Sequence, residues 1–63
     1  MYQQLVGKRT KIVFQDGSNI VVVKGVLKQY DENIKTISLL KDSNEIVLIN
    51  VAYIFKAEVL SDE

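Results

Sequence analysis

The stretch GVLKQYDENIKTISLL, Gly25 to Leu40, contains two apolar segments separated by a polar turn, and its glycine lies inside a longer apolar run. Residues 31–33 are Asp, Glu and Asn, which predict a turn between two strands. The apolar run before this turn starts at Ile20, is β-branched at its beginning and is long for a strand in so small a chain. Gly25 lies near its middle, where a residue without Cβ permits a sharp bend or the close passage of another backbone. The stretch therefore predicts one long strand, bent at Gly25, that contributes to both walls of a small barrel.

The rest of the chain predicts four more strands. Thr10, Ile12 and Phe14 alternate with polar or charged neighbours and Val13, which is the period of a half-buried strand. Asp-Gly in QDGSN supplies the positive-φ residue of a hairpin turn. With no proline and turn signals about every ten residues, the pattern indicates an all-β fold, a five-stranded and strongly bent antiparallel barrel in a single domain, residues 1–63. We expect strands at residues 8–14, 20–30, 35–41, 45–50 and 54–60.

The two ends of the chain have their own patterns. Tyr2, Leu5 and Val6 recur at helical spacing and Gly7 follows as a C-cap, so a short N-terminal helix is expected over residues 1–7. Residues 61–63 are predicted to fray as a tail. No run approaches the roughly 20 apolar residues of a membrane span, and residues 1–7 lack the features of a secretory signal. We expect a soluble, cytoplasmic protein that does not bind membranes.

The size and composition exclude most site chemistry. A domain of 63 residues buries only about 60% of the surface that its unfolded chain exposes, so small proteins often need reinforcement. The chain has no Cys and no His, so a disulfide, the usual zinc site, a thiolate nucleophile and an imidazole base are all excluded. The paired acids Asp31-Glu32 and Asp62-Glu63 lack a neighbouring ligand set. The composition therefore predicts no enzyme, no metal and no cofactor, and leaves self-association as the reinforcement.

The net charge is zero, which argues against a strongly electrostatic nucleic-acid binder. The charges are unevenly distributed along the chain, however, since residues 1–30 contain five basic side chains and only one acid, Asp16. Residues 31–63 contain seven acids and three lysines. Two interpretations remain open: opposite charges on different edges that favour head-to-tail assembly, or a compact fold that intermixes them.

Apolar residues occupy both faces of two predicted strands. In the second strand they fall at odd and even positions alike over residues 20–27, and the fourth strand repeats this over residues 46–49. A barrel interior uses only one face of a strand. The surplus predicts a subunit interface, and the absence of proline leaves the edge strands open for pairing.

The chain resembles the Sm and Sm-like (Lsm) family of small β-barrel proteins. The resemblance rests on the short helix, the five strands, the long bent second strand and a pattern of apolar, Gly, Leu, aromatic, Asp and apolar residues, here Val23, Gly25, Leu27, Tyr30, Asp31 and Ile34. It implies an SH3-like barrel whose fifth strand adds to the fourth strand of the next subunit and closes a homo-oligomeric ring. It also implies that single-stranded RNA binds around the central hole. Similar small barrels, including the C-terminal domain of the ribosome maturation factor family, do not form rings.

The resemblance also implies which residues contact RNA. The turn after the second strand offers Asp31, Asn33 and Lys35, and the turn after the fourth strand offers Asn50. RNA-binding members of the family have arginine and glycine where this chain has Asn50 and Val51. An arginine stacks on a base and pairs with phosphate, which asparagine does not do.

Each of these residues also has a simpler interpretation. Asp31 and Asn33 are common turn formers, and a solvated lysine at the end of a strand is the usual state of a residue such as Lys35. Tyr30 is either a stacking platform or, more simply, an aromatic side chain that closes the barrel wall. The basic cluster at residues 8–11 either meets a nucleic-acid backbone or is a solvated strand edge, and an aromatic pair at residues 53–55 is interpreted as interface packing.

Two functions follow from these patterns. The first is a non-catalytic RNA-binding protein that forms a ring, a component of ribonucleoprotein particles. The alternative is a protein-interaction or scaffold module that keeps the barrel and its interface but has lost RNA binding. RNA binding requires Asn33, Lys35 and Asn50 to converge on one surface, whereas a scaffold requires only exposed apolar strands.

Overall fold

The computed structural model describes residues 2–61, with the side chain of Ser61 excepted. Five strands form, and their bounds agree with the predicted ones to within two residues. The last strand includes Ser61, and the rest of the predicted tail lies outside the described residues, as does Met1. In chain order the elements are η1 (Tyr2–Leu5), β1 (Arg9–Asp16), β2 (Asn19–Asp31), β3 (Thr36–Lys41), β4 (Ile46–Asn50), η2 (Val51–Tyr53) and β5 (Ile54–Ser61).

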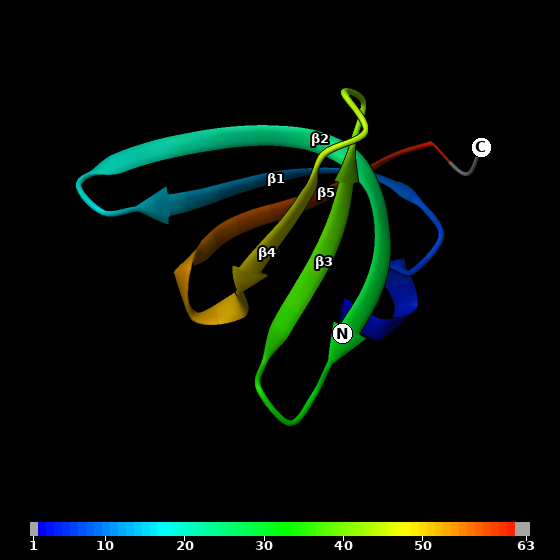
Figure 1. Cartoon of the computed structure of the whole chain (residues 1–63), viewed down its shortest axis with the longest axis horizontal. Helices are drawn as coiled ribbons and strands as arrows, with labels where there is room; N and C mark the ends of the chain where they lie inside the picture. The colour runs from blue at the N-terminus through cyan, green and yellow to red at the C-terminus, as the bar shows by residue number, and fades with distance from the viewer. Residues whose placement is uncertain (1, 62–63) are drawn as a thin grey trace.

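The five strands form one antiparallel sheet in the order β4-β3-β2-β1-β5 (Figure 1). The all-β prediction is therefore confirmed. Closure into a barrel is not, because β4 and β5 occupy the two ends of this order and do not pair with each other within residues 2–61. The reason lies in the connection between them: η2 ends β4 after five residues, and Ile54 then pairs directly with Phe14 of β1. Each outer strand is held by only one neighbour.

The long second strand is bent as predicted, and Gly25 is the point of closest approach. A Cβ built on Gly25 would lie 2.2 Å from the carbonyl oxygen of Leu40 and 2.9 Å from the Cα of Lys41. These are backbone atoms of β3, so no side chain can rotate out of the way. Pairing between β2 and β3 begins at this residue, with Gly25 opposite Lys41. Figure 1 shows β2 arching from the β1–β2 hairpin at the left of the view, over the top of the molecule, to the β2–β3 turn at the bottom.

The β1–β2 hairpin has the predicted Asp-Gly turn, and only Gly17 and Ser18 lie between the paired ends of the two strands. Asp16 pairs with Asn19, and Gly17 between them has a φ of +64°. Ser18 does not share the positive φ, which is the pattern of a type II′ turn with glycine at its first central position. This turn type matches the right-handed twist of the flanking strands, so it fixes the register of β1 on β2.

The N-terminal segment is a single 3-10 turn and not the longer helix that was predicted. Its hydrogen bonds run from the N–H of Val6 to the carbonyl of Gln3, 3.3 Å, and from the N–H of Lys8 to the carbonyl of Leu5, 3.0 Å. Gly7 ends the turn with a φ of +90°. Four residues are too few for a stable α-helix, and the spacing of three residues in these bonds suits so short a piece.

Two contacts fasten this turn to the sheet. The N–H of Gly7 donates to the carbonyl of Leu27 at 2.7 Å, and the ring of Tyr2 lies 5.8 Å from the ring of Tyr30. Burial, and to a lesser extent the neighbouring Tyr30, raises the pKa of Tyr2 above its ordinary value. Tyr30 itself is half-buried against the core, which agrees with the interpretation of this residue as part of the wall.

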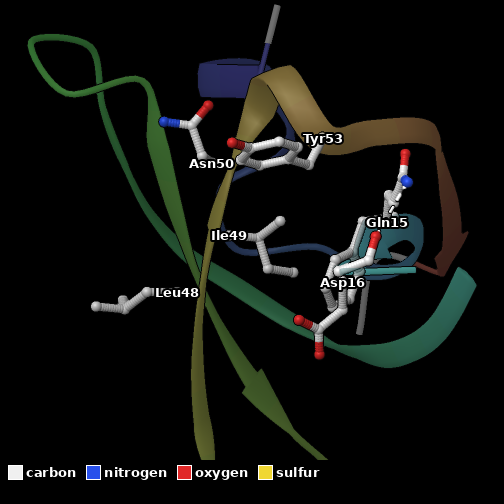
Figure 2. Close-up of a pocket in the computed structure, with 8 residues that line it drawn as sticks. Gln15, Asp16, Leu48, Ile49, Asn50 and Tyr53 are labelled. Carbon is white, nitrogen blue, oxygen red and sulfur yellow. Dashed lines mark hydrogen bonds between the residues drawn. The ribbon is translucent and has the colours of Figure 1, made fainter. Parts of the chain in front are cut away.

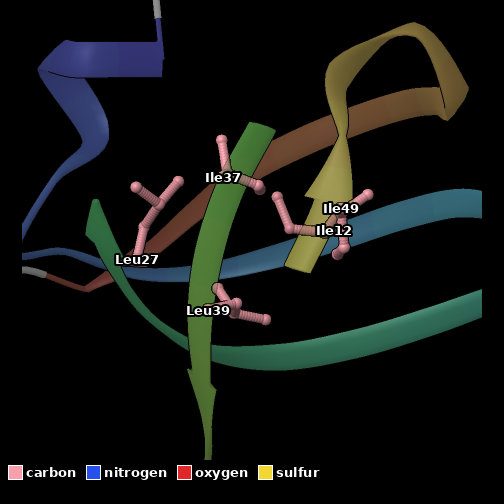
Figure 3. Close-up of a cluster of buried hydrophobic side chains, with 5 residues drawn as sticks. All are labelled: Ile12, Leu27, Ile37, Leu39 and Ile49. Atoms are coloured by element: carbon pink, nitrogen blue, oxygen red, sulfur yellow. The ribbon is translucent and has the colours of Figure 1, made fainter. Parts of the chain in front are cut away.

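The core lies on the concave face of the sheet. Its fully or almost fully buried side chains come from four strands (Figure 3): Ile12, Leu27, Ile37, Leu39 and Ile49. The alternation predicted for β1 is confirmed at Thr10 and Ile12, which are both buried, and on β3 Ile37 and Leu39 point inward and alternate with half-buried neighbours. A core of five side chains at about 1.5 to 3 kcal/mol each gives a small total stability for the single chain.

Many large apolar side chains remain on the surface, and they are concentrated on the outer strands and on the free end of β2. They are Ile20, Val22, Ile34, Ile46, Leu48, Tyr53, Phe55, Val59 and Leu60. Because strands alternate, the convex face of β4 carries Ile46 and Leu48 while Ile49 is buried. In the described part of the chain no helix is long and apolar enough to cross a membrane.

Replacing Gly25 tests the bend. Gly25→Ala is expected to destabilise the protein by about 3 kcal/mol or more, because the added methyl overlaps with the β3 backbone and β2 and β3 must separate. Gly17→Ala is the matched control: its Cβ meets nothing within 4 Å, so only the positive φ costs about 1 to 2 kcal/mol. Urea unfolding of both variants measures the difference. Equal unfolding midpoints would contradict the close approach at Gly25.

Candidate nucleic-acid interface

Two turns that are distant in sequence are joined at one end of the sheet. The first connects β2 to β3, and the second is the junction between β4 and η2. The N–H of Val51 donates to the carbonyl of Lys35 at 2.8 Å, and the side-chain amide of Asn50 donates to the carbonyl of Ile34 through Nδ2 at 3.4 Å. The structure therefore brings together the two turns from which the predicted RNA-binding residues come.

Asp31 serves as a turn former. Its Oδ1 accepts a hydrogen bond from the N–H of Asn33 at 3.0 Å, the pattern of an Asx turn. Asn33 is exposed, and only its backbone takes part in this bond. The carboxylate of Asp31 is therefore used within the turn, whereas the side-chain amide of Asn33 is presented to solvent.

Lys35 occupies a conformation that a lysine rarely adopts. Its φ is +54°, in the left-handed region, where a residue with a Cβ costs about 1 to 2 kcal/mol. Glycine or asparagine is the usual choice there, as at Asn44, whose φ is +71°. The chain keeps an exposed lysine at this position, so its side chain projects from the turn beside the β4–η2 junction.

Asn50 joins the turns through both ends of its side-chain amide. Oδ1 accepts a hydrogen bond from the N–H of Ala52 at 2.9 Å and caps η2, while Nδ2 reaches Ile34. An arginine has no acceptor atom and does not cap a helix in this way. These two contacts give Asn50 a structural role that an arginine at this position would not fill.

A hollow of about 520 Å³ lies beside this junction (Figure 2). It is lined by the end of the β1–β2 hairpin and by β4 and η2, namely Phe14, Gln15, Asp16, Gly17, Leu48, Ile49, Asn50 and Tyr53. The ring of Tyr53 borders the hollow next to Asn50, and this side chain is 59% exposed. An exposed aromatic ring is a surface on which a nucleic-acid base stacks.

Sequence reasoning interpreted Tyr53 as interface packing and did not place it in the site. Three residues of 3-10 turn have neither the alternation of a strand nor the period of a longer helix, so no pattern indicated where its ring points. The available signal was Asn50 itself. Asparagine is a common N-cap residue, whose side chain accepts a hydrogen bond from the N–H two residues later, so it indicates a turn at that point.

Acidic side chains outnumber the cation near the joined turns, because Asp31 and Glu32 lie in the same turn as Lys35. The basic cluster at residues 8–11 also meets acids: Arg9 pairs with Asp42 at 2.7 Å and Lys11 lies 3.9 Å from Glu58. These ion pairs link the basic first half of the chain to its acidic second half. The fold thus intermixes the charges, the second of the two interpretations.

Glu45 forms a local ion pair with Lys41 at the β3–β4 turn. Hydrogen bonds from Ser43 and Lys41, together with the lysine charge, lower the pKa of the Glu45 carboxyl. Among residues 2–61 no group of three acidic side chains is placed to hold a metal ion. The chemistry available at the joined turns is therefore hydrogen bonding, stacking and one cationic side chain.

Removing the Asn50 amide tests the joint between the turns. Asn50→Ala is expected to lower the free energy of unfolding by about 1 to 2 kcal/mol, because the η2 cap and the contact with Ile34 are lost together. Asn50→Asp keeps the capping acceptor and loses only the Nδ2 donor, so its cost is expected to be smaller. Urea unfolding measures both. An Asn50→Ala variant as stable as the parent would mean that this side chain does not join the turns.

Comparison with protein-family models, with curated proteins and with solved structures finds no match for this chain. The resemblance to Sm-like proteins therefore rests on the sequence pattern alone.

Proposed function

We propose that this chain is a cytoplasmic, non-catalytic Sm-like protein that assembles into a homo-oligomeric ring and binds single-stranded RNA at the joined turns. The observation that carries the proposal is the pair of hydrogen bonds that fix the β2–β3 turn against the β4–η2 junction. The resemblance implies that residues from both turns hold an RNA base, and these bonds hold the two turns against each other. In a ring, the same site repeats in every subunit.

The open sheet supports the assembly step. Along a strand, the N–H and C=O groups of successive residues point to opposite sides. The N–H of Lys41 donates to the carbonyl of Glu45, so the backbone groups of Glu45 face β3. Those of Ile46 and Leu48 therefore face away from β3. On β5 the register with β1 leaves those of Ala57 and Val59 facing outward. Within residues 2–61, β4 and β5 each form backbone hydrogen bonds with a neighbouring strand on one side and with no strand on the other. The open side of β5 of one subunit can therefore pair with the open side of β4 of the next.

The exposed polar groups support the RNA step. Asn33 offers an amide to a base edge, Lys35 a charge to phosphate, and Tyr53 a ring for stacking. A single lysine in the site of each subunit attracts RNA only weakly. A ring presents several copies to one strand of RNA, so the contributions combine by multivalency.

A second function, a self-assembling scaffold for protein contacts, is favoured by one observation at the same place. Both ends of the Asn50 amide are already occupied by backbone groups of its own chain, and Asp31 and Glu32 offset the charge of Lys35. In this case the ring forms in the same way through β4 and β5, and the joined turns serve only to stiffen it.

Titration of fluorescent oligo(U) and oligo(A) distinguishes the two functions. We expect saturable binding that weakens as salt rises, with the oligomer mass determined by light scattering on the same sample. Lys35→Gly is expected to weaken binding about tenfold, because every subunit loses its cation, and to raise the stability by about 0.5 to 1 kcal/mol, because the left-handed conformation suits glycine.

Lys24→Ala is the matched control, since it removes one exposed lysine from β2, remote from the joined turns, and is expected to leave the affinity unchanged. A stable oligomer that binds neither RNA would favour the scaffold. A monomer that binds neither would contradict both functions.

A further inference from the structure

The free end of β2 has a strand on one side only. Asn19 to Lys24 pair with β1, but β3 joins β2 only from Gly25 onward. Figure 1 shows the β1–β2 hairpin extending beyond the end of β3. Within residues 2–61, no strand pairs with this part of β2 on its other side. The molecule therefore has a third open sheet edge besides β4 and β5.

The register determines which backbone groups face this edge. The N–H of Leu27 donates to the carbonyl of Lys8, and the carbonyl of Leu27 accepts from Gly7, so Leu27 directs its backbone groups toward the start of β1. Alternation carries this phase along β2, and even-numbered residues therefore direct theirs to the opposite side. Ile20, Val22 and Lys24 accordingly present their N–H and C=O groups to the open edge.

The strand itself exposes apolar side chains, and a hollow with polar residues on its far side lies beside it. Ile20 is 68% exposed and Val22 is 54% exposed, and the run IVVVK contains no proline. A hollow of about 570 Å³ lies between the strand and the β3–β4 turn, lined by Val21, Val22, Val23, Lys24, Lys41, Asp42, Ser43 and Glu45. An unblocked, β-branched edge of this kind is a template for another strand.

We propose that this edge pairs with the same edge of a second copy of the chain, antiparallel, about a two-fold axis at Val22. The pairing sets Val22 opposite Val22, Val21 opposite Val23, and Ile20 opposite Lys24. All five residues of the run are then paired, with outward backbone groups meeting outward backbone groups. The contact is isologous, because one surface meets itself.

The sequence of the edge argues for a second copy as its occupant. Read in both directions, the run places β-branched side chains opposite β-branched ones, which is a favourable cross-strand combination. Its single charge, Lys24, falls opposite Ile20 and not opposite the partner's lysine, so no like charges meet. The exposed Val22 side chains of the two copies meet on the convex face, and Ile20 of each copy lies diagonally beside Val22 of the other.

This contact is separate from the β4–β5 contact of the proposed ring and does not depend on it. Ring closure is head-to-tail and uses two different edges, whereas the β2 contact joins two chains or two rings back to back. If both contacts form, the assembly contains an even number of chains and twice the mass of one ring. If only the β2 contact forms, the protein is a dimer.

Charge substitution at Val22 tests the two-fold. Val22→Lys sets two lysines opposite each other and Val22→Glu two glutamates, so each variant alone is expected to sediment at half the mass of the parent protein. An equimolar mixture sets lysine opposite glutamate and is expected to recover the parent mass. Ile34→Lys, which changes a similarly exposed side chain outside the edge, is the control and is expected to keep the parent mass.

Parent mass in either Val22 variant alone, or no recovery in the mixture, would overturn the proposal, as would a monomeric parent protein. Leu48→Lys separates this contact from the ring. It charges the β4 edge and leaves a dimer if the β2 contact exists, whether or not the ring forms. A Leu48→Lys monomer would show that β4 and not β2 carries the association.

A cross-link gives an independent reading of the register. In an antiparallel pair whose residues exchange hydrogen bonds, the two Cα atoms lie about 5.5 Å apart, within the range that a disulfide spans. The chain has no native cysteine, so Val22→Cys introduces a single thiol. Mild oxidation is expected to convert most of it to a covalent dimer while Ile34→Cys stays monomeric on a denaturing gel. No preference for Val22→Cys would contradict the two-fold at this residue.

Discussion

The close approach of Gly25 to the carbonyl of Leu40 is the constraint on which the rest of the structure depends. Because β2 lacks a side chain there, it bends under β3 and can pair with β1 along one half and with β3 along the other. The bend curves the sheet, and the curvature gives a concave face on which Ile12, Leu27 and Ile37 meet. It also carries the β2–β3 turn to the end of the sheet where the β4–η2 junction receives it. One residue without a Cβ therefore sets both the core and the candidate site.

The same bend accounts for the open edges. Because β2 pairs with β1 along its first half and with β3 along its second, the first half of β2 has no neighbour on its other side within residues 2–61. β4 and β5 lie at opposite ends of the strand order. The chain has neither a disulfide nor a large core to offset this exposure. Apolar side chains remain on these edges, among them Leu48 and Val22. In the proposed assemblies, association between copies pairs these backbone groups and covers this apolar surface.

The strands, their faces and the role of Gly25 could be predicted because alternation and turn residues act locally. The open sheet could not be predicted, because it depends on where η2 directs the chain after Asn50. A 3-10 turn of three residues has no periodic pattern in the sequence. The candidate site divides in the same way. Asp31 was expected as a turn former and is one, whereas the left-handed φ of Lys35 and the double role of Asn50 arise from contacts between turns distant in sequence.

In the proposed ring, β5 of one subunit pairs with β4 of the next. Hydrogen exchange of single backbone amides, followed by NMR, tests it most directly, because Ile46 and Leu48 on β4 and Ala57 and Val59 on β5 direct their N–H groups away from the chain's own strands. Our account predicts that these four amides are protected to the same degree as those inside the sheet at concentrations where the protein is assembled, and that protection is lost on dilution. Rapid exchange of all four amides at every concentration would contradict it.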